Sequence, residues 1–235
     1  MNNTDTKYPA LIPIHYPKTG DQNSTVRIGV ISVDGRTSPT WVSIPCDGEG
    51  YHSNSNSYLA DMSYHQSSGR ILIQQINRLQ NHVTIWCVDP QTPAAPHVIF
   101  EDRDDAWIDI LHEMHWINSG DTFLYISDRN GWKQIFAVNL DDPNQNQNPL
   151  ALTPVGLDVE SIQGVCQSSG YVYYIASPHD PLRRYLFRAT FDGTEIFRVT
   201  PESAEYRGTN AYTLSKDGNF AIHTFSTAHS PSSFW

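Results

Sequence analysis

Two groups of residues in this 235-residue sequence have the side-chain types needed for metal binding or catalysis. The first is the run His112-Glu113-Met114-His115, whose imidazoles could serve as metal ligands if a helix brought them to one face. The neighbouring residues favour a strand, where positions i and i+3 face opposite sides, so we expect no metal site. The second group, His223 with Ser226 and Asp217, has the residue types of a hydrolytic triad. Because these types are common, coincidence explains the grouping better, and we predict no catalytic residue.

The elements that would position these residues are short strands in a repeating unit. Residues 116–154 contain three runs rich in β-branched and aromatic residues, each bounded by Gly, Asp, Asn or Pro. Such runs, separated by turn signals like Asn130-Gly131, predict an antiparallel meander. A fourth strand fits between residues 106 and 117. The unit is therefore predicted to have four strands and a length of about fifty residues.

This unit recurs along the chain at a nearly constant spacing. The turns before the second strand of each unit contain Gly69, Gly120, Gly170 and Gly218, which are 51, 50 and 48 positions apart. Four strands repeated at a fixed period of about 40–50 residues are the signature of a β-propeller. A β-sandwich with similar hairpins is the alternative, but sandwiches do not hold so constant a spacing. We therefore predict an all-β, propeller-like fold.

The predicted strands divide a single domain, residues 1–235, into whole and partial blades. Residues 1–25 are predicted to be an extended lead-in. The predicted units are a half blade at 26–57, whole blades at 58–105, 106–157 and 158–208, and a half blade at 209–235. The two halves are complementary, so either a closed four-blade ring or an open arc of a larger ring is consistent with the pattern. In an arc, the exposed half-blade edges predict pairing with another chain and hence a homo-oligomer.

Composition limits the class of partner. The formal net charge of −10 argues against nucleic acid or an anionic membrane as a partner. No apolar run approaches the roughly twenty residues that span a bilayer, and residues 1–20 lack the basic and apolar regions of a signal peptide. Cys46, Cys87 and Cys166 lie far apart, which predicts buried free thiols and neither disulfides nor a zinc site. No pattern predicts a cofactor, and none indicates a compartment.

Several motifs, taken together and in order, cover nearly the whole chain. They are HYPKTG (15–20), NRLQN (77–81), WID (107–109), SDRNGW (127–132) leading to Ile135-Phe136, LTP (152–154) with Val159-Glu160, and residues 171–181 with LFR (186–188). This ordered set resembles the N-terminal propeller of the dipeptidyl peptidase IV family of serine peptidases. In that family the propeller has eight blades, so the resemblance implies that this chain is its middle-to-late half.

The resemblance implies a function of which the chain supplies only one part. The family's nucleophile lies in a Gly-x-Ser-x-Gly elbow on an α/β-hydrolase domain, and no such motif occurs here. The glutamates that hold the substrate's amino terminus are expected upstream of residue 1. The resemblance thus implies an inactive propeller fragment that shapes access of peptides, typically with Pro or Ala in second position, to an absent domain releasing N-terminal dipeptides. A stand-alone propeller that binds a protein or another ligand is the alternative.

The resemblance also implies which residues face the substrate. In the family, the strand that follows the tryptophan of the WID motif approaches the substrate pocket from the propeller side. The predicted substrate-binding residues are therefore Trp107, Asp109 and His112. An ordinary inner strand lining the central channel is the alternative reading of the same segment.

Three arginines are predicted to have a structural role. The planar guanidinium group suits paired hydrogen bonds to a carboxylate. We therefore expect Arg78, Arg183 and Arg184 to form ion pairs with Asp or Glu residues of adjacent blades. The alternative, a functional role for these side chains, has less support in the sequence.

Overall fold

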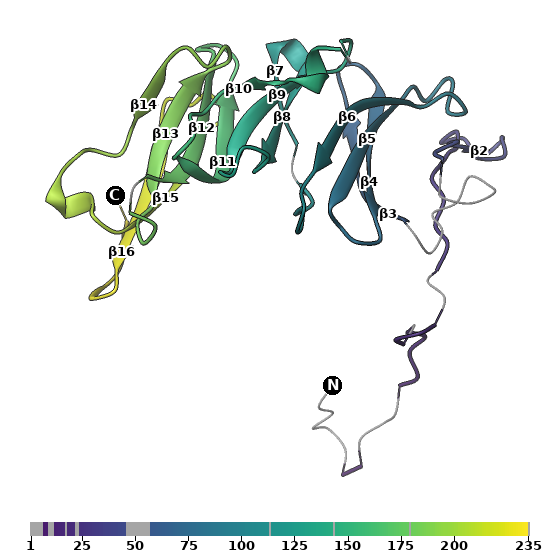
Figure 1. The fold of residues 1–235 in the computed structure, drawn as a ribbon, viewed down its shortest axis with the longest axis horizontal. Helices are drawn as coiled ribbons and strands as arrows, with labels where there is room; N and C mark the ends of the chain where they lie inside the picture. The colour runs from purple at the N-terminus through teal and green to yellow at the C-terminus, as the bar shows by residue number, and fades with distance from the viewer. Residues whose placement is uncertain are drawn as a thin grey trace.

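The computed structural model describes residues 7–8, 12–16, 18–21, 24–45, 57–112, 114–142, 144–178 and 180–234. Within these ranges the regular elements are strands and three short 3-10 helices, so the predicted all-β class is confirmed. None of the described helices is long and apolar enough to cross a bilayer. The strands form five antiparallel sheets, which follow one another in chain order across the molecule (Figure 1).

Three of the sheets have four strands each, and in each of them consecutive strands pair. The first contains β3 (Ser57–His65), β4 (Arg70–Asn77), β5 (His82–Val88) and β6 (His97–Arg103). The second contains β7 (His115–Ile117), β8 (Thr122–Ser127), β9 (Gln134–Asn139) and β10 (Leu150–Ala151). The third contains β11 (Asp158–Cys166), β12 (Tyr171–Ser177), β13 (Tyr185–Thr190) and β14 (Ile196–Arg198). They confirm the predicted repeat of four-stranded antiparallel units.

The remaining two sheets are smaller. One is the pair β1 (Gly29–Val30) and β2 (Thr40–Trp41). The other contains β15 (Thr209–Leu214), β16 (Ala221–Thr227) and β17 (Ser230–Phe234). The prediction of only two strands after residue 209 is wrong by one strand. The sequence of β17, SPSSF, has a proline and no alternation of apolar and polar residues, so it carries no strand signal.

The strand predicted between residues 106 and 117 is wrong over most of its length, because only β7 pairs with β8. Upstream of β7, the Asp104 carboxylate accepts a hydrogen bond from the Trp107 amide at 3.2 Å. The Ile108 amide donates to the Gln80 carbonyl at 2.8 Å. These bonds occupy amides that a strand would use in its ladder, so the segment forms a connection, called here the linker loop (residues 104–112).

The middle strands are buried on both faces and divide their side chains between two cores. In β8, Phe123 and Tyr125 pack into the core shared with the first four-stranded sheet, whereas Leu124 packs into the core shared with the third. All three side chains are 1% exposed or less. Neighbouring residues of a strand point to opposite faces, so the side chains of each such strand must pack against a sheet on either side. This explains why TFLYIS is a continuous apolar run without polar alternation.

The predicted arginine ion pairs across adjacent sheets are wrong for the three residues named. Arg184 pairs with Glu160 of the same sheet at 2.6 Å, and Arg183 pairs locally with Asp180 at 3.0 Å. The guanidinium of Arg78 instead lies over an aromatic ring of its own sheet, 5.5 Å from the Tyr58 centroid. Among the described residues, the arginine pairs that do link neighbouring sheets are Arg70–Asp141 (2.6 Å) and Arg129–Asp102 (2.8 Å).

Two of the cysteines are buried free thiols, as expected. Cys87 is 1% exposed and Cys166 is 4% exposed, and both are unpaired. Burial raises the pKa of the Cys87 thiol, which keeps it neutral. Cys46 lies outside the described residues.

A histidine at the end of β3 forms a contact between the first two four-stranded sheets. The His65 ring stacks on Trp116 with 4.0 Å between ring centroids, and its Nδ1 lies 2.8 Å from the Ser68 hydroxyl. The same ring lies against Gly120, where an added Cβ would overlap the imidazole. Gly120 also has a φ of 101°, a conformation that favours glycine. This contact therefore depends on a position that cannot carry a side chain.

We expect Gly120→Ala to lower the melting temperature more than Gly170→Ala. Gly170 is the matched control, because it occupies the corresponding turn of the next sheet with a φ of 72° and has no atom within 4 Å of a built Cβ. Both replacements introduce backbone strain of about 1 kcal/mol, whereas only the first displaces His65. Thermal unfolding followed by circular dichroism measures the difference. Equal losses would contradict this account of the contact.

Candidate functional site

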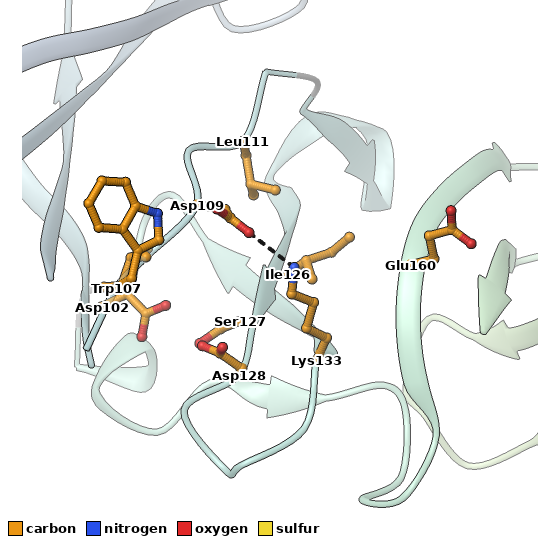
Figure 2. Close-up of a pocket in the computed structure, with 10 residues that line it drawn as sticks. Asp102, Trp107, Asp109, Leu111, Ile126, Ser127, Asp128, Lys133 and Glu160 are labelled. Atoms are coloured by element: carbon orange, nitrogen blue, oxygen red, sulfur yellow. Dashed lines mark hydrogen bonds and ion pairs between the residues drawn. The ribbon is translucent and has the colours of Figure 1, made fainter. Parts of the chain in front are cut away.

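The linker loop borders a cavity of about 190 Å³, called here the Trp107 cavity. It lies where the end of β6, the end of β8 and the start of β11 meet. The lining residues are Asp102, Trp107, Ile108, Asp109, Leu111, Ile126, Ser127, Asp128, Lys133 and Glu160. Figure 2 shows Glu160 on β11, across the cavity from the side chains of the linker loop.

Two buried side chains hold the linker loop against the first four-stranded sheet. Gln74 of β4 is 1% exposed, and its amide donates a hydrogen bond to the Leu111 carbonyl at 2.5 Å. Ile108 is 6% exposed and packs into the core between the first and second four-stranded sheets. The loop is thus fixed at two points, which places the exposed side chains of Trp107 and Asp109 at the cavity.

The structure brings two of the three predicted substrate-binding residues together. Trp107 and Asp109 line the same cavity, whereas His112 lies outside its lining. The His112 side chain is 81% exposed, and its Nδ1 is 3.1 Å from a carboxylate oxygen of Asp61 on β3. Within the described ranges, no three His, Cys, Asp or Glu side chains are arranged to hold a metal ion. Substrate binding by the three predicted residues stays a prediction.

The residues considered for a hydrolytic triad have other partners. His223 Nε2 lies 2.8 Å from the Asn210 side-chain oxygen, and its ring stacks on Tyr212 with 4.4 Å between centroids. Asp217 lies in the turn between β15 and β16 and accepts a hydrogen bond from the Ser215 hydroxyl at 2.5 Å. His223 and Ser226 are three positions apart on β16, so they point to opposite faces.

Carboxylates dominate the charge of the Trp107 cavity. Four lining residues are acidic and one is basic. Three of the four carboxylates have a cationic partner, in the pairs Asp109–Lys133 (3.1 Å), Asp102–Arg129 (2.8 Å) and Glu160–Arg184 (2.6 Å). The fourth, Asp128, forms no ion pair within the part of the chain that the structure describes.

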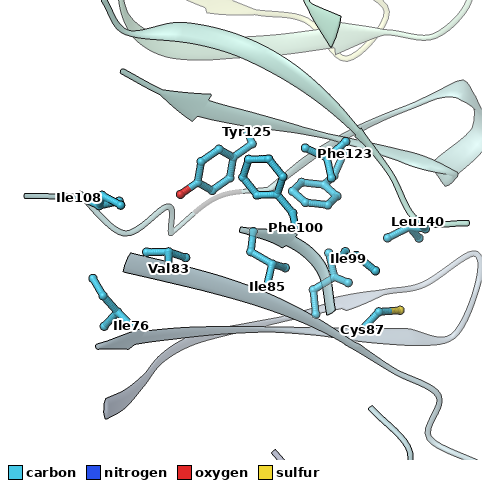
Figure 3. Close-up of a cluster of buried hydrophobic side chains, with 12 residues drawn as sticks. Ile76, Val83, Ile85, Cys87, Ile99, Phe100, Ile108, Phe123, Tyr125 and Leu140 are labelled. Carbon is cyan, nitrogen blue, oxygen red and sulfur yellow. The ribbon is translucent and has the colours of Figure 1, made fainter. Parts of the chain in front are cut away.

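The pair formed by Asp102 and Arg129 is the buried one. The Asp102 side chain is 3% exposed and that of Arg129 is 21% exposed. The guanidinium lies 4.7 Å from the Phe100 ring centroid, an arrangement that adds cation–π attraction. Figure 3 shows Phe100 next to Tyr125 in the core. Their ring centroids are 4.8 Å apart. The pair therefore joins β6 of one sheet to the β8–β9 turn of the next.

We expect Asp102→Ala to lower the free energy of unfolding by about 2–4 kcal/mol, since it leaves a largely buried guanidinium unpaired. The loss is smaller than for a fully buried pair because Arg129 keeps some access to water. Asp109→Ala, which removes the exposed pair with Lys133, should change the same quantity by less than about 1 kcal/mol. Urea unfolding of both variants measures the two values. A larger loss of unfolding free energy for Asp109→Ala than for Asp102→Ala would contradict the view that the buried pair is the stabilising one.

Two further cavities adjoin the Trp107 cavity. One, of about 170 Å³, shares Leu111, Ile126 and Glu160 with it and has the apolar side chains Leu124 and Ile162 in its lining. The other, of about 560 Å³, shares Lys133 and Glu160 with it. Its remaining lining residues include Trp132, Pro178, Pro181 and Arg184. All three cavities thus meet at Glu160, giving an extended site with an apolar, a charged and an aromatic part.

Sequence reasoning missed Asp102, Asp128, Lys133 and Glu160 as site residues. The SDRNGW motif and Val159-Glu160 carried the family resemblance, but no role was assigned to them. The one feature of the sequence that could have identified these charged residues is that they lie at or near the ends of predicted strands. Which strand ends meet in space depends on how the sheets stack, and the sequence pattern does not contain that information.

The fold and site define a β-propeller segment with a cavity where neighbouring sheets meet at their strand ends. The family model described as "Dipeptidyl peptidase IV (DPP IV) N-terminal region" matches residues 1–232. The chain therefore belongs to the dipeptidyl peptidase IV N-terminal region family, and the resemblance noted in the sequence is confirmed.

Similar proteins carry related names. A probable dipeptidyl peptidase 4 of Emericella nidulans is 24% identical over 210 residues, which cover 84% of this chain and 26% of that protein. A probable dipeptidyl-aminopeptidase B of Paracoccidioides lutzii is 26% identical, with 86% of this chain and 23% of that protein covered. The crystal structure of Porphyromonas gingivalis dipeptidyl peptidase 4 has a TM-score of 0.80 and 24% identity, covering 99% of this chain and 30% of that one. The chain spans between 23% and 30% of the length of these proteins.

Proposed function

We propose that this chain is the propeller region of a dipeptidyl-peptidase-IV-like serine exopeptidase, and that it shapes how peptides reach a catalytic domain in a longer polypeptide. The observation that carries the proposal is the family match over residues 1–232. The chain has no Gly-x-Ser-x-Gly motif, so by itself it is inactive. The substrates are peptides, typically with Pro or Ala in second position, from which N-terminal dipeptides are released.

The linker loop is the part of the chain that contacts substrate in this proposal. Trp107 is 53% exposed at the cavity, a large apolar surface that a passing peptide can cover. Asp109 offers a carboxylate beside it, and His112 stands exposed three residues further along the same loop. Because buried groups of the first four-stranded sheet fix this loop, the contacts it offers are preorganised.

The edge of the last sheet supplies the second element of the proposal. Among the described strands, β17 pairs on one side only, with β16. Phe234 is 73% exposed and Ile222 is 58% exposed, and both lie on the same face of this sheet because Phe234 is opposite Thr224. An open edge with exposed apolar side chains is a template for further strands. In the proposal, whole blades at 58–105, 106–157 and 158–208 are followed by a partial one that pairs with another strand, supplied by a second copy when this chain is alone.

The proposed function is tested on the native protein, isolated with an antibody raised against this chain. We expect a polypeptide much heavier than 26.5 kDa that cleaves a Gly-Pro chromogenic substrate and reacts with a fluorophosphonate probe for serine hydrolases. The purified chain of 235 residues is the control and should not cleave the substrate. A native polypeptide of 26.5 kDa without activity would contradict the proposal and identify a stand-alone binding propeller.

Pairing through the open edge is tested by light scattering of the purified chain. We expect the molar mass to rise above 26.5 kDa with increasing concentration, since the exposed edge of β17 favours association. Replacing Ile222 by Lys on the exposed face should reduce this rise, because charged side chains oppose edge and face association. A mass that stays at 26.5 kDa at every concentration would contradict the pairing.

A further inference from the structure

We propose that the Trp107 cavity is a subsite for a lysine side chain of a peptide. The inference rests on the proposed function in one respect, namely that the ligand is a peptide. It goes further by naming the kind of side chain that the cavity selects. Three features of the cavity support it: an unneutralised carboxylate, an alkylammonium group already present, and apolar surface of suitable shape.

The first feature is the charge of the lining. Asp102, Asp109 and Glu160 each have a cationic partner, but Asp128 has none within the described residues. A cation that enters the cavity therefore meets a carboxylate that holds no ion pair with a described residue. The chain as a whole has a net charge of −10, which attracts cations and repels anionic ligands.

The second feature is the side chain of Lys133, which places an alkylammonium group at the cavity. Its Nζ lies 3.1 Å from an Asp109 carboxylate oxygen (Figure 2). The cavity thus accommodates the same chemical group that a lysine-containing peptide would bring. The Lys133 and Asp109 side chains are 43% and 72% exposed, so their ion pair is weak and does not close the site to a second ammonium.

The third feature is the surface around the carboxylates. Ile108, Leu111 and Ile126 line the cavity together with the half-exposed indole of Trp107. A lysine side chain can lay its four methylene groups along such a surface while its ammonium reaches the carboxylates. The face of an indole ring attracts cations in addition.

A buried hydroxyl group lies behind this surface. Tyr125 is 0% exposed, and its hydroxyl lies close to the Asp102 carboxylate, which helps to raise its pKa. In Figure 3 the hydroxyl points toward Ile108, which lines the cavity. Burial raises the pKa of Tyr125, and Asp102 adds to the effect, so the group is neutral and retains an acceptor. Because Tyr125 is neutral and lies outside the lining, it adds no positive charge that would offset the carboxylates of the cavity.

The experiment compares two blocked peptides that differ in one charge. Acetyl-Gly-Lys-Gly-amide and acetyl-Gly-norleucine-Gly-amide are titrated into the chain of 235 residues by isothermal calorimetry. We expect the lysine peptide to bind at least about fivefold more tightly, a ratio typical of a charge-assisted contact beside an aromatic ring. Equal affinities would overturn the proposal. n-Butylammonium alone should bind more weakly than the lysine peptide, and equal binding would overturn the peptide part of it.

Two variants should shift the affinity in opposite directions. Asp128→Asn removes the unneutralised carboxylate and should weaken binding of the lysine peptide, whereas Lys133→Met removes a competing ammonium and should strengthen it. Asp105→Asn is the matched control, because Asp105 is exposed, lies outside the cavity lining and changes the net charge by the same amount as Asp128→Asn. Circular dichroism melting verifies that each variant is folded. Equal weakening by Asp128→Asn and Asp105→Asn would overturn the subsite in favour of general electrostatic attraction.

The outcomes separate this subsite from the proposed function. A native protein that releases dipeptides, combined with equal binding of the lysine and norleucine peptides, would overturn the subsite and leave the peptidase assignment in place. A native polypeptide of 26.5 kDa without activity, combined with a retained lysine preference, would support the subsite and overturn the peptidase assignment.

Discussion

The structure depends on strands that are buried on both faces. Because β8 sends Phe123 and Tyr125 into one core and Leu124 into the next, a change in its register would disturb two sheets at once. A polar side chain is tolerated on such strands only if it is hydrogen-bonded. The side-chain amide nitrogens of Gln74 on β4 and Gln134 on β9 donate to the carbonyls of Leu111 and Thr153, both at 2.5 Å, whereas the Gln74 side-chain oxygen has no partner among the described residues. Each of these bonds also holds a connecting segment in place, so the requirement to satisfy a buried amide fixes a loop.

The site follows from the same constraint. The interior between the sheets is filled by apolar side chains, which leaves the strand ends and their connections as the places where polar groups can gather. The linker loop is held there by Gln74 and by burial of Ile108, and the neighbouring turn is held by the Arg129–Asp102 pair. Glu160 enters from a third sheet through the start of β11. A cavity built from three sheets keeps its shape only as long as their packing does, so its geometry is coupled to the stability of the fold.

The repeat could be predicted from the sequence because it is marked by residues that the local backbone conformation requires. The turn glycines that set the period all have a positive φ, between 69° and 101°; they are Gly69, Gly120, Gly170 and Gly218. A positive φ favours glycine, so each tight turn shows directly in the sequence. The linker loop could not be predicted in this way, because its Ile108 amide bonds to Gln80 in an earlier turn. Trp107 and Asp109 were identified through the family resemblance, but the partners of the cavity come from strands far apart in the chain.

Asp128 illustrates how a site can conflict with stability. Four carboxylates around one cavity repel one another, and Lys133, Arg129 and Arg184 offset this repulsion for three of them. For the fourth, no described cation does so, and its negative charge also adds to the raised pKa of the buried Tyr125. Asp128 also begins the β8–β9 turn, where its carbonyl accepts a hydrogen bond from the Gly131 amide at 2.7 Å, so its backbone serves the fold while its carboxylate faces the cavity. In the proposed lysine subsite, the carboxylate of Asp128 therefore connects the packing of the sheets to recognition of a cationic ligand.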